Sequence, residues 1–315
     1  MRARCGGGCV ERHAALVSGG ALEAPGVCLS SEGLIALRAV ALGAQMPPVL
    51  AALPGGFATR RKGHGLEVAD MREYVAGDDI RHLDRGTTAR TGRLHVRQFQ
   101  EERDRVTLLI ADFRPCMFWG MRRAFRSVAV AEALALIGWN VVESGGRVGL
   151  LTVSAGGPVI VPPRGRTRGM LDVIGGMVQA HRAGLRAMAA GQDVDPALES
   201  ALLRADRLVP AGGEFIIGSG FDAPGPGFAD RLDALARRRV PRLVMITDAQ
   251  MLRMPSGRYP IRLADGRRMR VSLGGKTPPP ETRIAGRVAL LLDAGEEVEH
   301  MARRIVAGFP AERAA

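Results

Sequence analysis

Short apolar runs alternate with segments of helical periodicity through most of the chain after residue 105. Continuous runs of about four to eight apolar residues are typical of strands that are buried on both faces of a parallel sheet. The intervening segments place apolar residues at the spacing of an amphipathic or buried helix. The predicted strands are 106–111, 148–153, 214–217 and 243–247, with a short partner strand at 158–161, and the predicted helices are 124–142, 170–178, 197–208 and 228–235. This alternation predicts an α/β fold with a mostly parallel sheet and helices on both faces.

The pattern changes near the C-terminus. Two strand-like segments, 261–263 and 269–273, flank the dipeptide Asp265-Gly266, which is typical of a tight hairpin turn, so we predict a late β-hairpin within 259–273. Beyond it, apolar residues at helical spacing predict helices to the end of the chain. These residues are Ile284, Val288, Leu291, Leu292, Val298, Met301 and Ile305.

The N-terminal part has less periodicity. Residues 1–29 are rich in glycine, and Ser30 or Ser31 is in position to cap a helix that carries Leu34, Leu37 and Leu42 on one side. We therefore predict three parts along the chain. These are an N-terminal extension with one helix over 1–59, a motif-rich segment over 60–103, and an α/β domain over 104–315.

The motif-rich segment combines acidic and basic residues at close spacing. Gly77-Asp78 predicts a turn, and Asp79 is predicted to cap a short helix that runs to about residue 89. Nearby arginines favour a network of ion pairs. Two interpretations stay open and are compatible: a structural clasp that joins this segment to the sheet domain, and a surface that binds a partner. The candidate residues are Arg72, Tyr74, Gly77, Asp78, Asp79, Arg81, Asp84 and Arg90.

The string MREYVAGDDIRHLDRGTTARTGRLHVRQFQEE, residues 71–102, resembles the domain-of-unknown-function 58 family. The hallmark of that family is an Arg-x-Tyr, Gly-Asp-Asp-x-Arg, Asp-Trp and Ala-Arg block before a von Willebrand factor A-like domain. The resemblance covers most of residues 60–275, although Arg85 stands where the family usually has Trp. It implies a von Willebrand factor A-like, Rossmann-like fold. It also implies a partnership with MoxR-type AAA+ ATPases in the assembly or maturation of other proteins.

The resemblance further implies a metal site at the end of the first strand, where Asp-x-Ser-x-Ser normally holds Mg²⁺. Here Asp112 is followed by Arg114 and Cys116, which supply no hydroxyl, and Gly220 stands where an Asp is expected after the fourth strand. Cys is a poor ligand for a hard cation. We therefore predict a degenerate site without metal. Arg114 either pairs with Asp112 in place of a cation or points outward.

The charge is strongly positive. The 315 residues include 44 Lys and Arg against 32 Asp and Glu, and all but Lys62 and Lys276 of the basic residues are Arg. The arginines are dispersed, and only 4% of residues are aromatic, which disfavours base stacking and hence nucleic-acid binding. The excess favours a solvated basic surface or one that faces an acidic protein.

The cysteines and the apolar runs indicate the compartment. No stretch approaches the roughly 20 apolar residues of a membrane span, and four cysteines without signs of secretion indicate free thiols in a reducing compartment. We therefore expect a cytoplasmic protein. Cys5, Cys9, His13 and Cys28 match no common zinc-site spacing.

No motif predicts an enzyme. Cys116 has no His at a motif spacing, and the Gly-Gly pairs lack the Lys-Ser/Thr of a phosphate-binding loop. We therefore predict a non-catalytic adaptor without a cofactor, which contacts its ATPase through Arg114 and Trp119 at the carboxyl edge of the sheet. The alternative is an electrostatic binder of nucleic acid or of a membrane surface. A metal-dependent adhesion-type receptor would require the absent hydroxyls.

Overall fold

The computed structural model describes residues 23–44, 68–75, 78–99, 105–192, 196–262, 268–273 and 282–308. They belong to two compact units, a small one over 54–104 and a large one formed by 1–53 together with 105–315. The small unit nearly coincides with the motif-rich segment. The N-terminal helix, which we expected in a separate extension, belongs to the large unit.

The large unit is built on a seven-stranded sheet with the order β10-β11-β7-β6-β3-β4-β5. The five central strands are parallel, and the two edge strands are antiparallel to their neighbours. Every residue of β3 and β6 is buried. The prediction of a mostly parallel sheet is therefore confirmed. The strands are β3 (Val106–Phe113), β4 (Arg147–Ser154), β5 (Ile160–Gly165), β6 (Glu214–Ser219), β7 (Val240–Thr247), β10 (Arg283–Ile284) and β11 (Arg287–Asp293).

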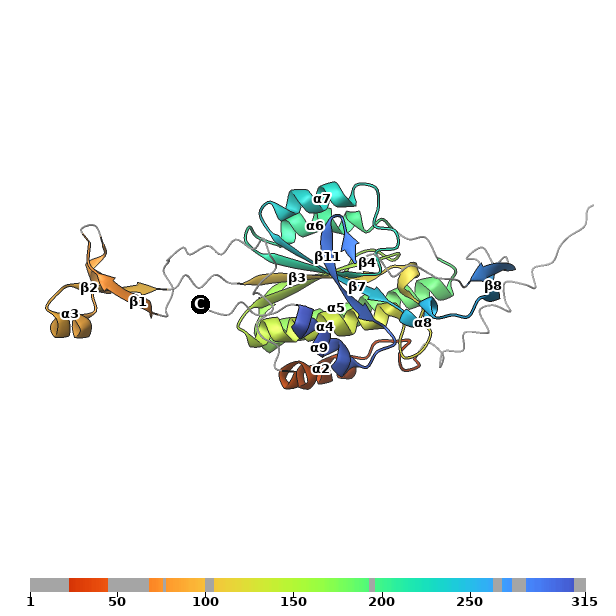
Figure 1. Ribbon diagram of the computed structural model, residues 1–315, viewed down its shortest axis with the longest axis horizontal. Coiled ribbons are helices and arrows are strands. Elements are labelled where there is room, and N and C mark those ends of the chain that lie inside the picture. The colour runs from red at the N-terminus through yellow and green to blue at the C-terminus, as the bar shows by residue number, and fades with distance from the viewer. Residues whose placement is uncertain are drawn as a thin grey trace, which may run out of the picture. The chain divides into compact units, whose positions relative to one another are not determined.

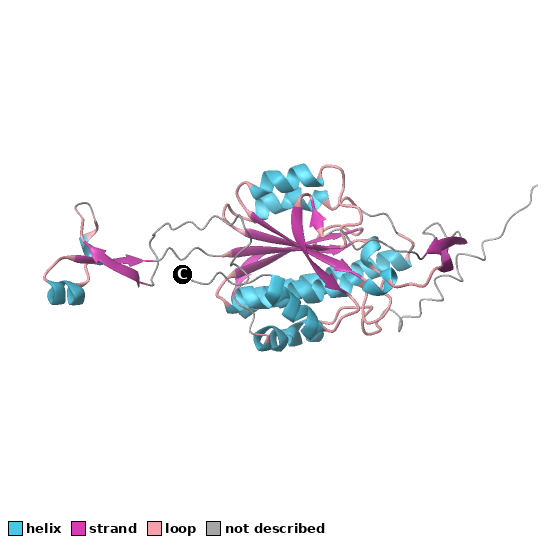
Figure 2. Ribbon diagram, viewed as in Figure 1, coloured by secondary structure: helices cyan, strands magenta, loops and turns pink. Residues whose placement is uncertain are grey.

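Helices cover both faces of this sheet, as predicted (Figure 1, Figure 2). One face packs against α4 (Arg126–Glu143), α5 (Arg166–Ala189) and α9 (Val298–Gly308), and α2 (Ser31–Gly43) packs on these helices. The other packs against α6 (Glu199–Leu208) and α7 (Phe228–Ala236). A short helix, α8 (Ala249–Leu252), follows β7. Within the described residues, every helix is too short or too polar to cross a membrane.

The N-terminal helix is fixed by a cap and by a contact with α4. The Ser30 hydroxyl accepts a hydrogen bond from the Gly33 amide, as the sequence predicts for a helix start. Leu34 and Leu37 are buried, whereas Leu42, which we expected on the same side, is 53% exposed. The Trp139 indole of α4 donates to the Leu34 carbonyl at 3.0 Å. The helix thus contributes to the core of the large unit.

The prediction of helix around residues 284–292 is wrong, because this segment forms β10 and β11. Ala289 and Leu291 face the apolar cluster under α6 and α7, whereas Leu290 and Leu292 face the cluster under α4 and α9. This alternation has the period of a strand buried on both sides. The pairing of β11 with β7 extends the parallel sheet.

The late hairpin is present as a separate two-stranded sheet of β8 (Gly257–Arg262) and β9 (Arg268–Leu273). The strands are antiparallel and pair in a continuous register from Gly257 opposite Leu273 to Arg262 opposite Arg268. The turn dipeptide Asp265-Gly266 lies outside the described residues.

The small unit contains an antiparallel pair, β1 (Val68–Glu73) and β2 (His95–Phe99), with η1 (Ile80–His82) and α3 (Arg85–Thr91) between them. Asp79 caps only η1, so the prediction that its helix continues to residue 89 is wrong. The chain is extended at Asp84, whose amide donates to the His95 carbonyl. The Asp84 carboxylate then accepts from the Thr87 amide at 2.7 Å and starts α3.

Candidate functional site at the carboxyl edge of the sheet

The carboxyl ends of parallel strands form the usual ligand-binding edge of an open α/β sheet. At this edge, Asp112 lies near the end of β3 and Arg114 directly follows the strand, and both side chains are 0% exposed. The Arg114 guanidinium donates through Nε to Asp112 Oδ1 at 2.9 Å and through Nη2 to Asp112 Oδ2 at 2.8 Å. The two residues therefore form a buried, bidentate ion pair. An outward-facing Arg114 does not fit this structure.

Arg114 also connects the end of β3 to two other loops. Its Nη1 donates to the Pro196 carbonyl at 3.1 Å and to the Ala223 carbonyl at 2.7 Å. Its own amide donates to Asp112 Oδ1 at 3.1 Å. Because one guanidinium satisfies acceptors from separate parts of the chain, it fixes how those loops meet at the sheet edge.

A third group completes the environment of Asp112. Ser219, at the end of the neighbouring β6, donates its hydroxyl proton to Asp112 Oδ2 at 2.6 Å and accepts from the Phe221 amide at 2.9 Å. Each Asp112 oxygen thus accepts two hydrogen bonds. The carboxylate has no position left for a cation, and the Arg114 charge lies where a cation would have to approach. These residues do not fit the divalent metal that the resemblance implies.

A second arginine, Arg126, explains why position 220 is Gly where the resemblance leads us to expect Asp. The Arg126 side chain, almost fully buried at the start of α4, donates through Nε to the Ile246 carbonyl at 3.0 Å and pairs with Asp222 at 2.9 Å. A Cβ atom at Gly220 would overlap the Arg126 guanidinium. Position 220 therefore has no room for a carboxylate side chain while Arg126 occupies this place. Among the described residues, no group of three or more His, Cys, Asp or Glu is arranged to hold a metal ion.

The loop after β3 forms the outer surface of this edge. The half-buried Trp119 donates its indole proton to the Cys116 carbonyl at 2.9 Å, and its ring centroid lies 5.2 Å from the Arg126 guanidinium. The Met121 amide donates to the buried Asp248 carboxylate at 2.7 Å. Met121 itself is 45% exposed. The loop is thus tied down at several points while part of it faces solvent.

The expectation that Arg114 contacts a partner needs correction. Its side chain is completely buried, so no part of it is available to another protein in this structure. Trp119 keeps an accessible part, and Met121, Arg122 and Asp222 are exposed around it. We call these four residues the edge surface. Arg114 supports the edge surface from below by holding its loops.

A buried histidine that the sequence analysis did not single out lies near this loop. His181 of α5 packs against the rings of Phe113 and Phe118, with centroids 5.4 and 5.0 Å away. Its Nε2 lies 3.0 Å from the Ser127 hydroxyl. Burial lowers the pKa of His181 to about 3, so the ring is neutral at physiological pH. A single His in an apolar helix carries no motif, and only tertiary packing identifies this one.

Among the described candidate residues of the small unit, Arg72 and Asp78 form an ion pair. Arg72 donates to Asp78 at 2.6 Å, and this hydrogen bond lowers the pKa of the Asp78 carboxyl and raises the pKa of Arg72. Asp78 also accepts from the Val75 amide, as expected for a turn residue. Within the described part of the chain, Arg81 and Arg90 are exposed and pair with neither Asp78 nor Asp79.

Two further candidates of this unit are Tyr74 and Gly77. The Tyr74 amide donates to the Leu94 carbonyl at 2.8 Å, which extends the pairing between the two strands. Gly77 lies outside the described residues, as do Cys5, Cys9 and His13. Cys28 and Cys116 are partly buried. The clasp interpretation remains a prediction, because the two compact units are described separately.

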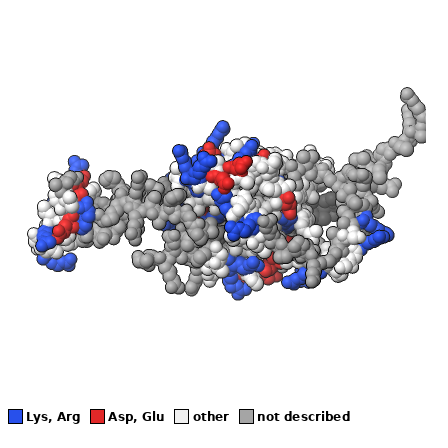
Figure 3. All heavy atoms as spheres, turned by 45° about the horizontal axis from the view of Figure 1, so that its top comes forward, with Lys and Arg blue, Asp and Glu red and all other residues white. Residues whose placement is uncertain are grey.

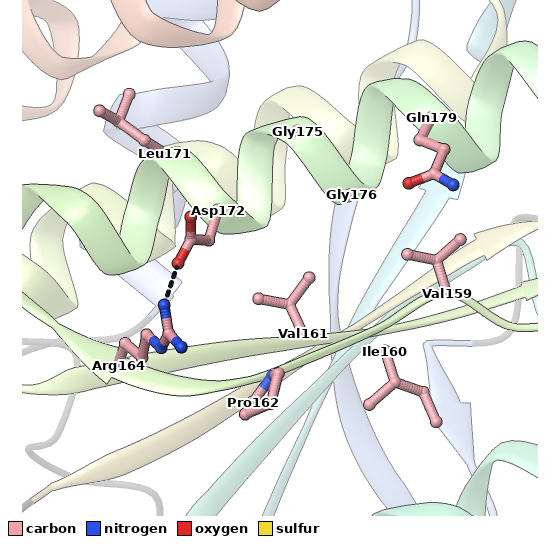
Figure 4. A pocket seen from close by; sticks show the side chains of 10 residues that line it. All are labelled: Val159, Ile160, Val161, Pro162, Arg164, Leu171, Asp172, Gly175, Gly176 and Gln179. Carbon is pink, nitrogen blue, oxygen red and sulfur yellow. Dashed lines mark hydrogen bonds and ion pairs between the residues drawn. The ribbon is translucent and has the colours of Figure 1, made fainter.

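A shallow groove of about 470 Å³ lies between the edge strand β5 and α5 (Figure 4). Val159, Val161 and the backbone at Gly175 and Gly176 line it. The only ionisable side chains among its lining residues, Arg164 and Asp172, pair with each other at 3.0 Å. The groove therefore offers an apolar contact surface but no free acid or base.

Comparison with known proteins agrees with the motif in the small unit. The family described as "Protein of unknown function DUF58" matches residues 70–269, which is more than half of the 315 residues. The chain belongs to the DUF58 family. It is also 38% identical over 128 residues to uncharacterized proteins of Mycobacterium bovis and Mycobacterium tuberculosis. That alignment covers 39% of this chain and 40% of those proteins, so the chain spans about two fifths of the length of the curated relatives it matches.

The buried pair generates a stability prediction for this DUF58 chain. Asp112→Ala or Arg114→Ala should each lower the free energy of unfolding by about 3–5 kcal/mol, because each leaves a buried charge without its partner. The double variant should lose less than the sum of the two, since it removes both charges. Urea denaturation measures all three. The exposed pair Arg164–Asp172 is the control, and its removal should cost less than about 1 kcal/mol. Equal losses at the two pairs would contradict the buried ion pair.

His181 generates a pH prediction. Its folded pKa lies below the unfolded value, so the unfolded chain binds one more proton between about pH 6.5 and 3. This residue should therefore destabilise the fold by about 1.4 kcal/mol for each pH unit below 6.5, and its contribution should be constant above that pH. His181→Gln should have a shallower loss of stability than the parent between pH 6.5 and 4. Parallel curves for parent and variant would show that the ring is protonated in the folded protein.

Proposed function

We propose that this DUF58 chain is a non-catalytic adaptor that binds a MoxR-type AAA+ ATPase through the carboxyl edge of a von Willebrand factor A-like domain. The fold assignment is supported by the central position of β3 and by Asp112 near its end, with Ser219 on the adjacent strand. The Asp112 carboxylate is in the place expected from the resemblance, whereas Arg114 and Cys116 stand where its two hydroxyls are expected. The ATPase supplies the energy, and the adaptor brings it to a client protein.

The Arg114–Asp112 pair is the observation that carries the proposal. A metal site built on Asp112 needs a carboxylate with free lone pairs, and both oxygens of Asp112 are already satisfied by internal donors. The permanent charge of an arginine is also not removed at any physiological pH. What this edge offers to another molecule is therefore a fixed surface, which suits protein binding better than chemistry.

The edge surface has the composition of a binding hot spot. Trp and Arg are enriched among the residues that dominate the binding energy at protein interfaces. Trp119 is held by its hydrogen bond to Cys116 and by the Arg126 guanidinium, so binding would cost it little conformational entropy. Met121 and Arg122 are exposed beside it in the chain. A basic adaptor also suits an acidic partner, which the net charge of +12 favours.

Truncation of the tryptophan tests this proposal. Trp119→Ala should weaken binding to the MoxR-type ATPase of the same genome by at least about tenfold, because it removes the anchored aromatic side chain of the surface. Isothermal titration calorimetry measures the affinity, and circular dichroism checks the fold. Leu203→Ala is the control, because Leu203 is 57% exposed on α6 and lies outside the edge surface. Unchanged affinity for a folded Trp119→Ala would contradict the proposed interface.

Charge reversal at Arg114 is not a suitable test of binding. A glutamate at this position would place a second carboxylate beside the buried Asp112, and the resulting repulsion would destabilise the fold itself. Loss of binding by such a variant would then report unfolding rather than a broken interface.

A further inference from the structure

The two strands of the late hairpin have faces of opposite character. In an antiparallel pair, residues directly opposite each other lie on the same face of the ribbon, and successive pairs alternate between faces. Three pairs place four arginines on one face. These three pairs are Arg258 with Ser272, Pro260 with Arg270, and Arg262 with Arg268. The intervening pairs place apolar residues on the other face, namely Gly257 with Leu273, Tyr259 with Val271, and Ile261 with Met269.

The apolar face has no extensive partner in the described structure. β8 and β9 form a sheet of their own, and among the described elements each packs extensively only against the other. An isolated two-stranded hairpin is marginally stable in water and gains stability when another layer covers its apolar face. This face of the hairpin therefore has room for a second layer that the described elements do not supply.

The basic face is also unusual for this protein. On the face that Figure 3 shows, acidic and basic side chains lie side by side in the large unit. Ion pairs such as Arg239–Asp206 and Arg287–Asp233 join arginines of this unit to acids. The strands of the hairpin contain no acidic residue. Arg258 and Arg270, the two arginines here whose side chains are described, are both exposed. The missing partner of this face is therefore an anionic one.

We propose that the β8–β9 hairpin binds an anionic lipid surface. A lipid interface contacts both faces of the ribbon at once. The apolar face enters the boundary between headgroups and acyl chains, and arginines of the other face reach the lipid phosphates through their long side chains. Tyr259, which follows Arg258 at the start of the hairpin, belongs to the residue types enriched at this depth.

Other anionic partners contact only one of the two faces. A nucleic acid binds the arginines but leaves five apolar residues exposed to water. An acidic protein surface covers one side of a ribbon and leaves the opposite side without a partner. A membrane surface is therefore the occupant that the register favours. This inference does not depend on the adaptor proposal, because it concerns a different element with different residues.

Vesicle co-sedimentation of the full chain tests the inference. The protein should bind vesicles of phosphatidylcholine with phosphatidylglycerol and should not bind vesicles of phosphatidylcholine alone. Arg258→Glu with Arg270→Glu should lower the partition coefficient at least about tenfold, because each arginine near an anionic surface contributes a substantial attraction. The control is Arg237→Glu with Arg238→Glu, which makes the same change in net charge at exposed positions near the end of α7. The control should bind within about twofold of the parent.

The apolar face requires a separate arm. High salt should weaken the binding of the parent but leave a residual fraction bound, because apolar insertion is not screened. Ile261→Ser with Val271→Ser should lose this residual fraction. The proposal is overturned if the two charge variants lose binding equally, since the attraction would then be general. It is also overturned if the parent does not bind anionic vesicles. Binding of a DNA duplex through Arg258 and Arg270, without binding to any vesicle, would overturn it in favour of a nucleic-acid partner.

Discussion

The pairing of Arg114 with Asp112 is the constraint on which the carboxyl edge of this structure depends. A fully buried charge is stable only when it is paired and when its remaining donors are satisfied. Arg114 meets this condition by bonding to Asp112 and to the carbonyls of Pro196 and Ala223. The same bonds set the positions of the loops, so the ion pair and the shape of the surface above it cannot vary independently.

Arg126 extends the same principle. It approaches Gly220 so closely that a side chain there would collide with it, and it reaches the Ile246 carbonyl and the Trp119 ring. Two internal cations therefore organise an edge that, in the fold we propose, would otherwise be organised by a metal ion. The result is a platform held by internal ion pairs and hydrogen bonds, with Trp119 anchored on it. This physical picture supports an adaptor role more directly than the overall charge of the chain does.

Some of this structure could be predicted from the sequence and some could not. Continuous apolar runs identified the central strands, because a strand buried on both faces has a distinct local pattern. The segment 287–293 was misassigned, since its apolar residues fit both a helix and a strand until the two clusters that cover it are known. The neutral His181 depends on tertiary contacts, which no local pattern reveals. The cap at Asp84 is a local contact with the Thr87 amide, and the sequence analysis did not assign it. Similarly, the sequence left both orientations of Arg114 open, because spacing does not say where a side chain points.

The most direct test of the central claim is a titration of the intact protein with Mn²⁺, followed by electron paramagnetic resonance of the free ion. If Arg114 is the cation of this site, the signal of free Mn²⁺ should be the same with the protein as with buffer, and Asp112→Asn should behave like the parent. Stoichiometric loss of the free signal in the parent, restored by Asp112→Asn, would show that Asp112 binds a metal and would contradict the account.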